Sequence, residues 1–258
     1  MPEILEIEMY RRGAAPVVGR TIDTVDAPDD WYLKGVDARS IRKALVGATI
    51  ESTGRRGKLM WLDTTAGVLG LRFGMTGRLV IDDEPVIEAL EYSSKRLDDD
   101  WVRFALHFRD GGALVMNDPR RLGGVSLDPD LDELGPDAWA LADGQLGEIL
   151  GASRSAVKAV LLNQQRLAGL GNLLADELCW RSHVDPRRVA KELRTDEVSR
   201  LEAELVPMLD ELYTRGGSHR GDHVEARDAQ GACPLDGSDM MHGTVGGRST
   251  WWCATHQH

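Results

Sequence analysis

The chain has 258 residues, 42% hydrophobic and 28% charged, a composition typical of a soluble globular protein that is long enough for two domains. It lacks any apolar run near the roughly eighteen residues that cross a membrane, and its acidic start excludes a secretion signal, so we expect a cytoplasmic protein. Three cysteines do not favour a disulfide framework, and the net charge of −11 disfavours nucleic-acid binding unless basic side chains gather in one cleft.

The first residues combine a nucleophile with a carboxylate. If Met1 is removed, as the small residue Pro2 permits, the chain begins with a secondary amine beside Glu3, and Glu6 follows one helical turn later. An α-amino group titrates about two to three pH units below lysine, so it offers more free base for attack on a carbonyl-like carbon. The same residues also fit an ordinary helix start, with proline first and acidic side chains in the first turn.

The elements of the first half are one helix and then short strands. A helix is predicted over residues 3–17, because apolar side chains recur along one side of that segment. From Thr21 to Val125 the pattern changes to short alternating runs broken by glycine and aspartate, and Asp110-Gly111-Gly112 indicates a hairpin turn. We therefore expect an amino-terminal β-sandwich domain, with the helix attached, over residues 1–127.

The second half is predicted to be mainly helical. Proline and aspartate mark a linker over residues 128–150, and a helical domain follows over residues 151–230. Its helical periodicity is clear in three segments, residues 155–162, 173–180 and 197–213. A short hairpin over residues 231–258 completes an α+β fold with two domains.

Four segments follow one another in an informative order. They are Pro2-Glu3-Ile4-Leu5-Glu6-Ile7-Glu8, Asn117-Asp118-Pro119-Arg120-Arg121-Leu122-Gly123, the run from Leu162 to Arg187 with Gly169-Leu170-Gly171-Asn172 at its centre, and Gly246-Gly247-Arg248-Ser249-Thr250. Together they resemble the formamidopyrimidine-DNA glycosylase and endonuclease VIII family. The resemblance implies that the helical domain over residues 151–230 contains a helix–two-turn–helix and that the hairpin over residues 231–258 is zinc-finger-like. The resemblance implies a monomeric DNA glycosylase and abasic-site lyase that removes oxidised bases from double-stranded DNA in the cytoplasm or nucleoid. It leaves open a lesion-binding paralogue without catalysis, and a ribosome- or RNA-associated protein.

The resemblance also assigns the catalytic residues. Pro2 is the nucleophile that attacks the sugar C1′, forming a Schiff base that permits β- and then δ-elimination, and Glu3 is the general acid/base. Glu6 supports them at the helix start. Lys58, after a glycine turn, reaches the lesion's phosphate, although a lysine in such a turn is also an ordinary surface charge. Leu5 departs from the proline that the family carries there.

DNA contacts are predicted in three places. Met75, Arg120 and Leu122 correspond to the side chains that fill the gap left by an everted nucleotide, although Met75 also suits a core and Leu122 replaces a common aromatic. The glycine turn is expected to offer free backbone N–H groups to a phosphate, although helix caps explain it equally well. The resulting set is Met75, Arg120, Arg121, Leu122, Gly171, Asn172 and Arg248.

The carboxy terminus has metal-ligand spacing. Cys233, Asp236, Cys253 and His256 follow the pattern C-x2-D-x16-C-x2-H, which is similar to the family's four-cysteine zinc hairpin with two ligands changed. His242 or His258 could replace Asp236, and a zinc-free hairpin held by Trp251 and Trp252 is the alternative. The loop between Gly217 and Cys233 is short for the family, and together with Leu122 it disfavours an enzyme strictly specific for 8-oxoguanine. The choice between an oxidised purine and an oxidised pyrimidine stays open.

Overall fold

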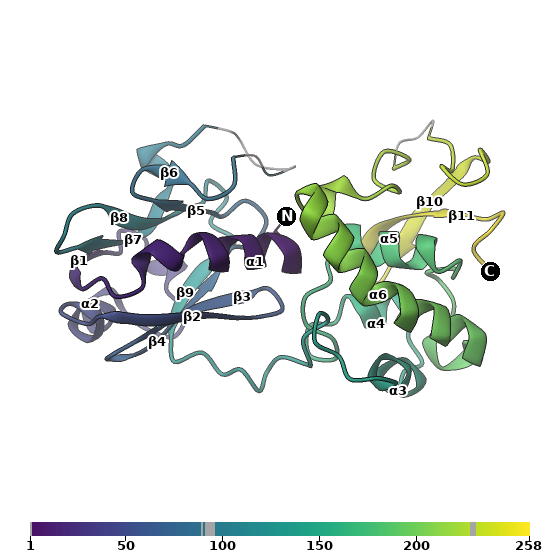
Figure 1. Ribbon diagram of the computed structural model, residues 1–258, viewed down its shortest axis with the longest axis horizontal. Coiled ribbons are helices and arrows are strands. Elements are labelled where there is room, and N and C mark those ends of the chain that lie inside the picture. The colour runs from purple at the N-terminus through teal and green to yellow at the C-terminus, as the bar shows by residue number, and fades with distance from the viewer. Residues whose placement is uncertain (1, 89, 91–95, 228–230) are drawn as a thin grey trace. The chain divides into compact units, whose positions relative to one another are not determined.

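The computed structural model describes residues 2–88, 90, 96–227 and 231–258, and these fall into two compact units (Figure 1). The first unit takes in Met1–Pro2 and Glu6–Leu131, and the second takes in Glu3–Leu5 and Asp132–His258. Strands dominate the first and helices the second, so the predicted two-domain α+β fold is confirmed. The finer division into four segments stays a prediction.

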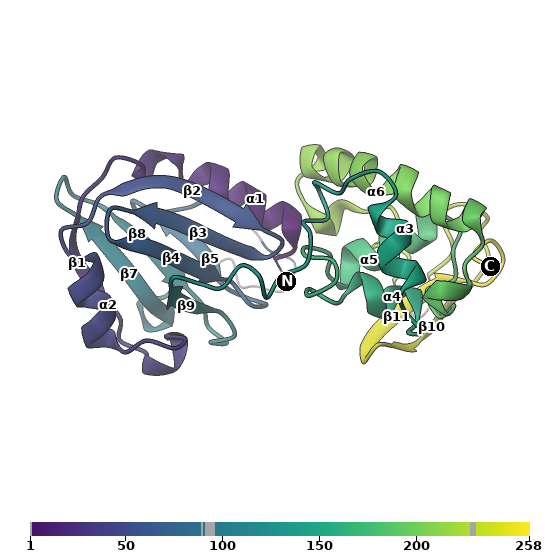
Figure 2. The same cartoon turned by 90° about the horizontal axis from the view of Figure 1, so that it is seen from below.

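Two antiparallel sheets form the first unit (Figure 2). The five-stranded sheet has the order β1 (Ile22–Asp26), β7 (Val102–Phe108), β8 (Ala113–Asn117), β5 (Arg78–Ile81), β6 (Glu84–Pro85). The four-stranded sheet has the order β2 (Ile50–Arg56), β3 (Leu59–Thr64), β4 (Gly67–Arg72), β9 (Gly124–Leu127). Strands β7 and β8 pair around the predicted Asp110-Gly111-Gly112 turn, and the unit's apolar core includes side chains from both sheets.

The helices of this unit differ from the prediction. Helix α1 (Ile4–Gly13) ends earlier than expected, and a short 3-10 turn, Ala15–Val17, follows it. Gly13 lies so close to Val86 that an added Cβ would come within 2.2 Å of that side chain. A second helix, α2 (Ala38–Leu45), was not predicted, because it is short and lies within a segment of strand-like pattern. Asp37 caps it by accepting a hydrogen bond from the Ser40 amide at 2.8 Å.

The second unit contains four α-helices in the part of the chain that the structure describes. They are α3 (Gln145–Gly151), α4 (Val157–Leu161), α5 (Asn172–Arg181) and α6 (Thr195–Arg215). All but the last residue of helix α3 lie within the predicted linker, and its Leu146 and Leu150 belong to the unit's core. None of the described helices is both long and apolar enough to span a bilayer.

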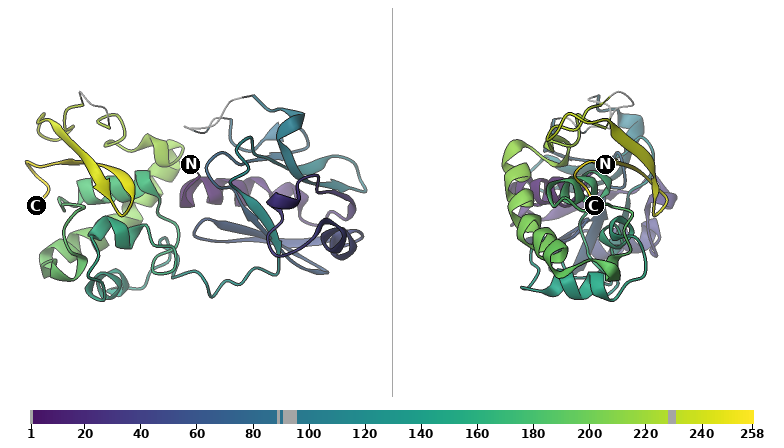
Figure 3. Two further views of the ribbon diagram at one scale, coloured as in Figure 1. Left: turned by 180° about the vertical axis from the view of Figure 1, so that it is seen from behind. Right: turned by 90° about the vertical axis from the view of Figure 1, so that its right-hand side faces the viewer.

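The hairpin of the second unit pairs β10 (Met240–Val245) with β11 (Arg248–Cys253), and α5 contacts β11 (Figure 3). Gly246 and Gly247 form its two-residue turn with φ values of +58° and +73°. Both values favour glycine, and paired positive φ angles suit the twist of a tight hairpin. The turn therefore places Arg248 at the first position of β11, where it is exposed.

Candidate functional site

The Glu3 carboxylate lies at the amino end of α5, within the second unit. Its oxygens accept hydrogen bonds from the backbone nitrogens of Gly171 at 2.6 Å, Leu173 at 2.9 Å and Leu174 at 3.3 Å. Glu3 is 1% exposed, and the partial positive charge of the helix end favours a carboxylate there. These amides, expected from the sequence to be free, donate to Glu3 in this structure, and the phosphate role of Gly171 stays a prediction.

Steric contacts explain why the two residues Gly169 and Gly171, before α5, are glycines. A Cβ at Gly171 would lie 2.3 Å from the Glu3 carboxyl carbon, and one at Gly169 would lie 2.5 Å from Ile4 Cδ1. Gly169 also has a φ of +126°, and its carbonyl accepts a hydrogen bond from the Ile4 amide at 3.1 Å. The helix–two-turn–helix that the resemblance implies corresponds to α4, the glycine turn and α5, and its glycines make room for residues 3 and 4.

Pro2 directly precedes this anchored glutamate. Pro2 is buried, and Glu6, in the first turn of α1, is 3% exposed. Three backbone donors fix the Glu3 carboxylate, and the Pro2 nitrogen belongs to the residue directly before it. A potential nucleophile and a buried carboxylate are therefore adjacent in the chain. Such a pair can attack an electrophilic carbon and move a proton.

Asp118 joins two turns of the first unit. Its buried carboxylate accepts hydrogen bonds from Thr76 Oγ1 at 2.6 Å, the Gly123 amide at 2.9 Å and the Arg120 amide at 3.2 Å. Gly74, at a φ of +58°, approaches the Leu122 backbone so closely that a Cβ would lie 2.4 Å from its carbonyl carbon. The turn that carries Met75 therefore lies beside the turn that carries Leu122.

The side chains of these two turns suit the predicted wedge. Leu122 is 49% exposed, which is unusual for a large apolar residue, and Met75 is half-buried rather than part of the core. Arg120 is exposed next to Leu122. Asp118 and Thr76 were not predicted as site residues, although Asp118 lies inside the recognised Asn117–Gly123 segment. An aspartate before a proline in that turn was the available signal.

Lys58 occupies the turn between β2 and β3. Gly57, just before it, has a φ of +54°, as the tight turn expected from the sequence requires. Lys58 is half-buried, and it lies in the first unit with Met75 and Leu122.

A buried cation supports the hairpin next to Arg248. Lys158 Nζ lies 2.6 Å from Asp176 and donates to the Ser249 carbonyl at 2.9 Å and to Thr250 Oγ1 at 2.8 Å. Both charged side chains are fully buried, and burial lowers the pKa of Lys158 and raises that of Asp176 to about 6, although their attraction opposes both shifts. The structure thus adds Lys158 and Asp176 to the predicted residues.

Asn172 contributes to the same support. Its side-chain nitrogen, predicted to serve a phosphate, donates to the Ser249 carbonyl at 3.0 Å. Ser249 O therefore receives donors from both Lys158 and Asn172, and β11 is fixed to the start of α5 at the residue that follows Arg248.

The four predicted metal ligands are brought together. One donor atom from each of Cys233, Asp236, Cys253 and His256 lies within 4.8 Å of the others. His256 Nδ1 is 3.0 Å from Asp236 Oδ2 and 3.5 Å from Cys233 Sγ, and Cys253 Sγ is 3.3 Å from Asp236 Oδ2. Two sulfurs, one nitrogen and one carboxylate oxygen can all bind zinc, so the donor set fits a tetrahedral ion.

His242, considered as a replacement for Asp236, lies elsewhere. Its Nε2 is 2.9 Å from Ser249 Oγ, and its ring stacks on Trp251 with a centroid distance of 4.4 Å. Among the described residues, neither His242 nor His258 belongs to the four-ligand group.

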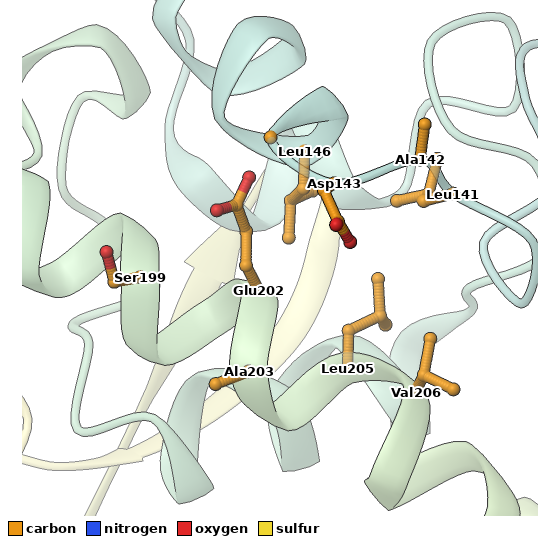
Figure 4. Close-up of a pocket in the computed structure, with 10 residues that line it drawn as sticks. Leu141, Ala142, Asp143, Leu146, Ser199, Glu202, Ala203, Leu205 and Val206 are labelled. Carbon is orange, nitrogen blue, oxygen red and sulfur yellow. The ribbon is translucent and has the colours of Figure 1, made fainter.

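A cavity of about 440 Å³ lies in the second unit, between the segment before α3 and helix α6 (Figure 4). Leucine and alanine side chains line it together with Asp143 and Glu202, and Glu202 also accepts a hydrogen bond from the Gly147 amide at 2.8 Å. None of the predicted site residues lines this cavity. Its acidic side chains do not suit a nucleic-acid phosphate.

Comparisons with known proteins agree with the recognised segments. The model for the formamidopyrimidine-DNA glycosylase N-terminal domain matches residues 1–125, and that for the formamidopyrimidine-DNA glycosylase H2TH domain matches residues 134–222. A formamidopyrimidine-DNA glycosylase from a Bradyrhizobium species is 32% identical over 295 residues, and one from Bacillus cereus is 31% identical over 281 residues. Each alignment covers 98% of both chains.

Solved structures show the same fold. Lactococcus lactis Fpg, in complex with DNA that contains an abasic site, matches with a TM-score of 0.84 at 22% identity. The same protein in complex with DNA that contains an oxidised pyrimidine matches with a TM-score of 0.84 at 23% identity. Both matches cover 100% of both chains.

Proposed function

Because this chain belongs to the formamidopyrimidine-DNA glycosylase family, we propose that it excises damaged bases from double-stranded DNA and then cleaves the abasic site. The observation that carries the proposal is the Glu3 carboxylate, which three backbone amides hold next to Pro2. The glycosylase activity follows the names of the relatives, and the lyase activity rests on the chemistry of an amino-terminal proline.

In the proposed reaction the Pro2 nitrogen, once Met1 is removed, bonds to C1′ of the damaged nucleotide. The bond from C1′ to the base breaks, the base leaves with a proton from water, and the Glu3 carboxylate takes the proton that the Pro2 nitrogen loses. Glu3 gives a proton to the sugar ring oxygen, so the ring opens and a Schiff base joins Pro2 to C1′. Loss of a C2′ proton then expels the 3′ phosphate by β-elimination, and loss of a C4′ proton expels the 5′ phosphate by δ-elimination.

The first unit supplies the lesion contacts in this proposal. Met75 and Leu122 fill the space left by the everted nucleotide, and Arg120 lies beside Leu122 to meet the opposite strand. The proximity of their two turns around Asp118 supports this assignment. Lys58 contacts the phosphate of the damaged nucleotide.

The second unit supplies phosphate contacts. Arg248 is exposed at the start of β11, and its neighbour Ser249 is held from two sides. An arginine on a fixed strand can bind a phosphate in a defined orientation. The phosphate roles of Gly171 and Asn172 also require their present partners, Glu3 and Ser249, to share or release them.

We also propose a structural zinc ion at the carboxy-terminal hairpin. Cys233, Asp236, Cys253 and His256 would hold the ion, and the bound metal would serve as a structural crosslink. Asp236 is itself fixed by the Ser238 amide, whose nitrogen donates to Oδ1 at 2.8 Å. The aspartate's other oxygen faces Cys253 and His256.

Borohydride trapping tests the proposal. The purified protein, with Met1 removal checked by intact mass, is incubated with abasic-site DNA and sodium borohydride, which reduces a Schiff base to a stable adduct. The wild-type protein and the exposed α2 variant Lys43→Ala should both give the adduct, and Pro2→Gly should not. A processed wild-type protein that binds the DNA without forming an adduct would instead support a lesion-binding paralogue without catalysis.

A further inference from the structure

An ion pair between Arg121 and Asp29 also holds the turn that carries Arg120 and Leu122. Arg121 Nε donates to Asp29 Oδ2 at 2.6 Å, and its terminal nitrogen Nη2 donates to Oδ1 at 2.7 Å. This is the planar, two-bond arrangement in which a guanidinium binds a carboxylate most specifically. The Asp29 side chain is 9% exposed, and that of Arg121 is 48% exposed.

Asp29 is itself fixed in place. Its Oδ1 accepts a hydrogen bond from the Trp31 amide at 3.1 Å, which caps the short 3-10 turn Asp30–Tyr32. Beyond this turn the chain runs along β9, where the Lys34 amide donates to the Val125 carbonyl at 2.8 Å. The carboxylate is therefore attached to the sheet edge that receives the Arg121 turn, and it is not a mobile surface acid.

Arg121 adopts a backbone conformation that needs support. Its φ is +57°, in the left-handed region that L side chains adopt rarely. Its amide donates only a long 3.4 Å hydrogen bond to the Asp118 carbonyl. Arg121 lies between Arg120 and Leu122, so the position of both neighbours depends on how firmly its backbone is held in this conformation.

Charge around the pair also disfavours a phosphate at Arg121. A cavity of about 460 Å³ beside the pair is lined by Asp29, Asp99, Asp100, Arg103 and Arg121. Arg103 Nε is 3.9 Å from the same Asp29 oxygen and donates to the Asp118 carbonyl at 2.9 Å. Three carboxylates thus face two guanidinium groups, a balance that does not attract an anion.

We infer that Asp29 is a positioning residue, which clamps Arg121 so that Arg120 and Leu122 meet the opposite strand of damaged DNA in one orientation. This inference rests on the proposed function, and it reassigns Arg121 from the predicted DNA contacts to a part of the clamp. It predicts that Asp29 controls which base opposite the lesion is tolerated, although Asp29 itself touches no DNA.

Hydrogen exchange tests the clamp without DNA. Asp29→Asn and Arg121→Gln should each raise the exchange rate of the amides of residues 120–124 by about tenfold or more, and the double variant should add little. Unchanged exchange in both single variants would overturn the inference. This measurement stands even if the wild-type protein neither binds nor cleaves abasic DNA, a result that would overturn the proposed function alone.

Activity on abasic-site duplexes with each of the four opposite bases provides the functional test. Asp29→Asn and Arg121→Gln should change the ratios of kcat/KM among the four duplexes by about fivefold, because a misplaced wedge discriminates poorly. A merely destabilised protein would lose activity equally on all four, and that result would contradict the inference.

The salt dependence of binding separates a clamp from a phosphate contact. Removing one phosphate contact reduces the slope of log affinity against log salt by about 0.9. Arg248→Gln, which removes the proposed phosphate contact of β11, is the control and should show that reduction, whereas Arg121→Gln should leave the slope unchanged. A reduction of equal size in Arg121→Gln would show that Arg121 leaves Asp29 for a phosphate, and the clamp would then be wrong.

Discussion

The Glu3 carboxylate and the Gly171 backbone nitrogen lie 2.6 Å apart, although 168 positions separate the two residues along the chain. The contact places Glu3 at the first turn of α5. The contact also explains why residue 171 is a glycine. Its φ of −116° is open to any residue, but a side chain at this position would collide with Glu3.

Gly171→Ala should therefore impair chemistry more than folding. The added methyl group would lie 2.3 Å from the Glu3 carboxyl carbon, so the carboxylate must move by about 1 Å. A displacement of that size at a reacting group costs about 100-fold in rate. We expect abasic-site cleavage under single-turnover conditions to fall by about this factor.

Gly151→Ala is the matched control for this prediction. It lies in the same unit, and a Cβ added there would meet nothing within 4 Å. It should retain full activity. If Gly171→Ala cleaves abasic DNA as fast as Gly151→Ala, the Glu3 carboxylate does not act from the position seen here.

The sequence predicted local structure better than long-range polar contacts. The β7–β8 hairpin, the glycine turn before α5 and the four-ligand group were all predicted, because each depends on residue types at short or recognisable spacings. The occupation of the α5 amides by Glu3 was not, since a free helix amino terminus and an occupied one have the same local pattern.

The contacts of Asp29 and Lys158 were missed for a related reason. Aspartate beside a 3-10 turn and lysine in an amphipathic helix are ordinary surface residues by type, and only the tertiary fold shows that both are buried against a charged partner. Helix α2 was missed because eight residues give little more than two turns of periodicity. Its signal was the capping aspartate, Asp37.

Asp236→Cys should strengthen zinc binding. A thiolate is a softer ligand than a carboxylate and is preferred by zinc in structural sites. We expect at least about tenfold higher zinc affinity, measured by competition with a coloured chelator, and one equivalent of zinc in the purified variant by elemental analysis. His242→Ala, outside the ligand group, should leave the affinity unchanged. An equal or lower affinity in Asp236→Cys would show that Asp236 does not occupy a ligand position.

Glu8 should make stability depend on acid pH. Burial alone would raise its pKa, but hydrogen bonds from Arg11, Arg12 and Arg55 outweigh burial and lower the pKa from 4.5 to about 2. The group binds protons less readily in the folded state, so its stabilisation is complete above pH 4.5 and disappears as the pH falls towards 2. Solvent screening limits the effect to about 1–2 kcal/mol.

Urea unfolding of Glu8→Gln across this pH range tests the assignment. The variant should be less stable than the wild-type protein at pH 7, and the difference should shrink steadily between pH 4.5 and pH 2. A difference that is the same at pH 7 and pH 2 would mean that the side chain contributes through packing rather than charge.

The Lys158–Asp176 pair should be costly to break and inexpensive to replace. Each charge lies in a fully buried position, so removing one partner strands the other, a change that costs about 3–5 kcal/mol in comparable pairs. Lys158→Met should therefore lower the free energy of unfolding by about 3 kcal/mol, the low end of that range, because Arg227 also lies 3.6 Å from Asp176. The double variant Lys158→Met/Asp176→Leu should recover part of that loss, since it removes both charges of the pair, although Arg227 loses Asp176 as a partner. Both variants lose the Lys158 bonds to Ser249 and Thr250, so both should bind abasic DNA more weakly, because the strand that carries Arg248 is held less firmly.

Urea unfolding and DNA titration of the same samples separate the effect on stability from the effect on binding. Stability should recover in part in the double variant, and DNA affinity should not. Recovery of both would show that the lysine acts only as a buried charge and does not position the hairpin.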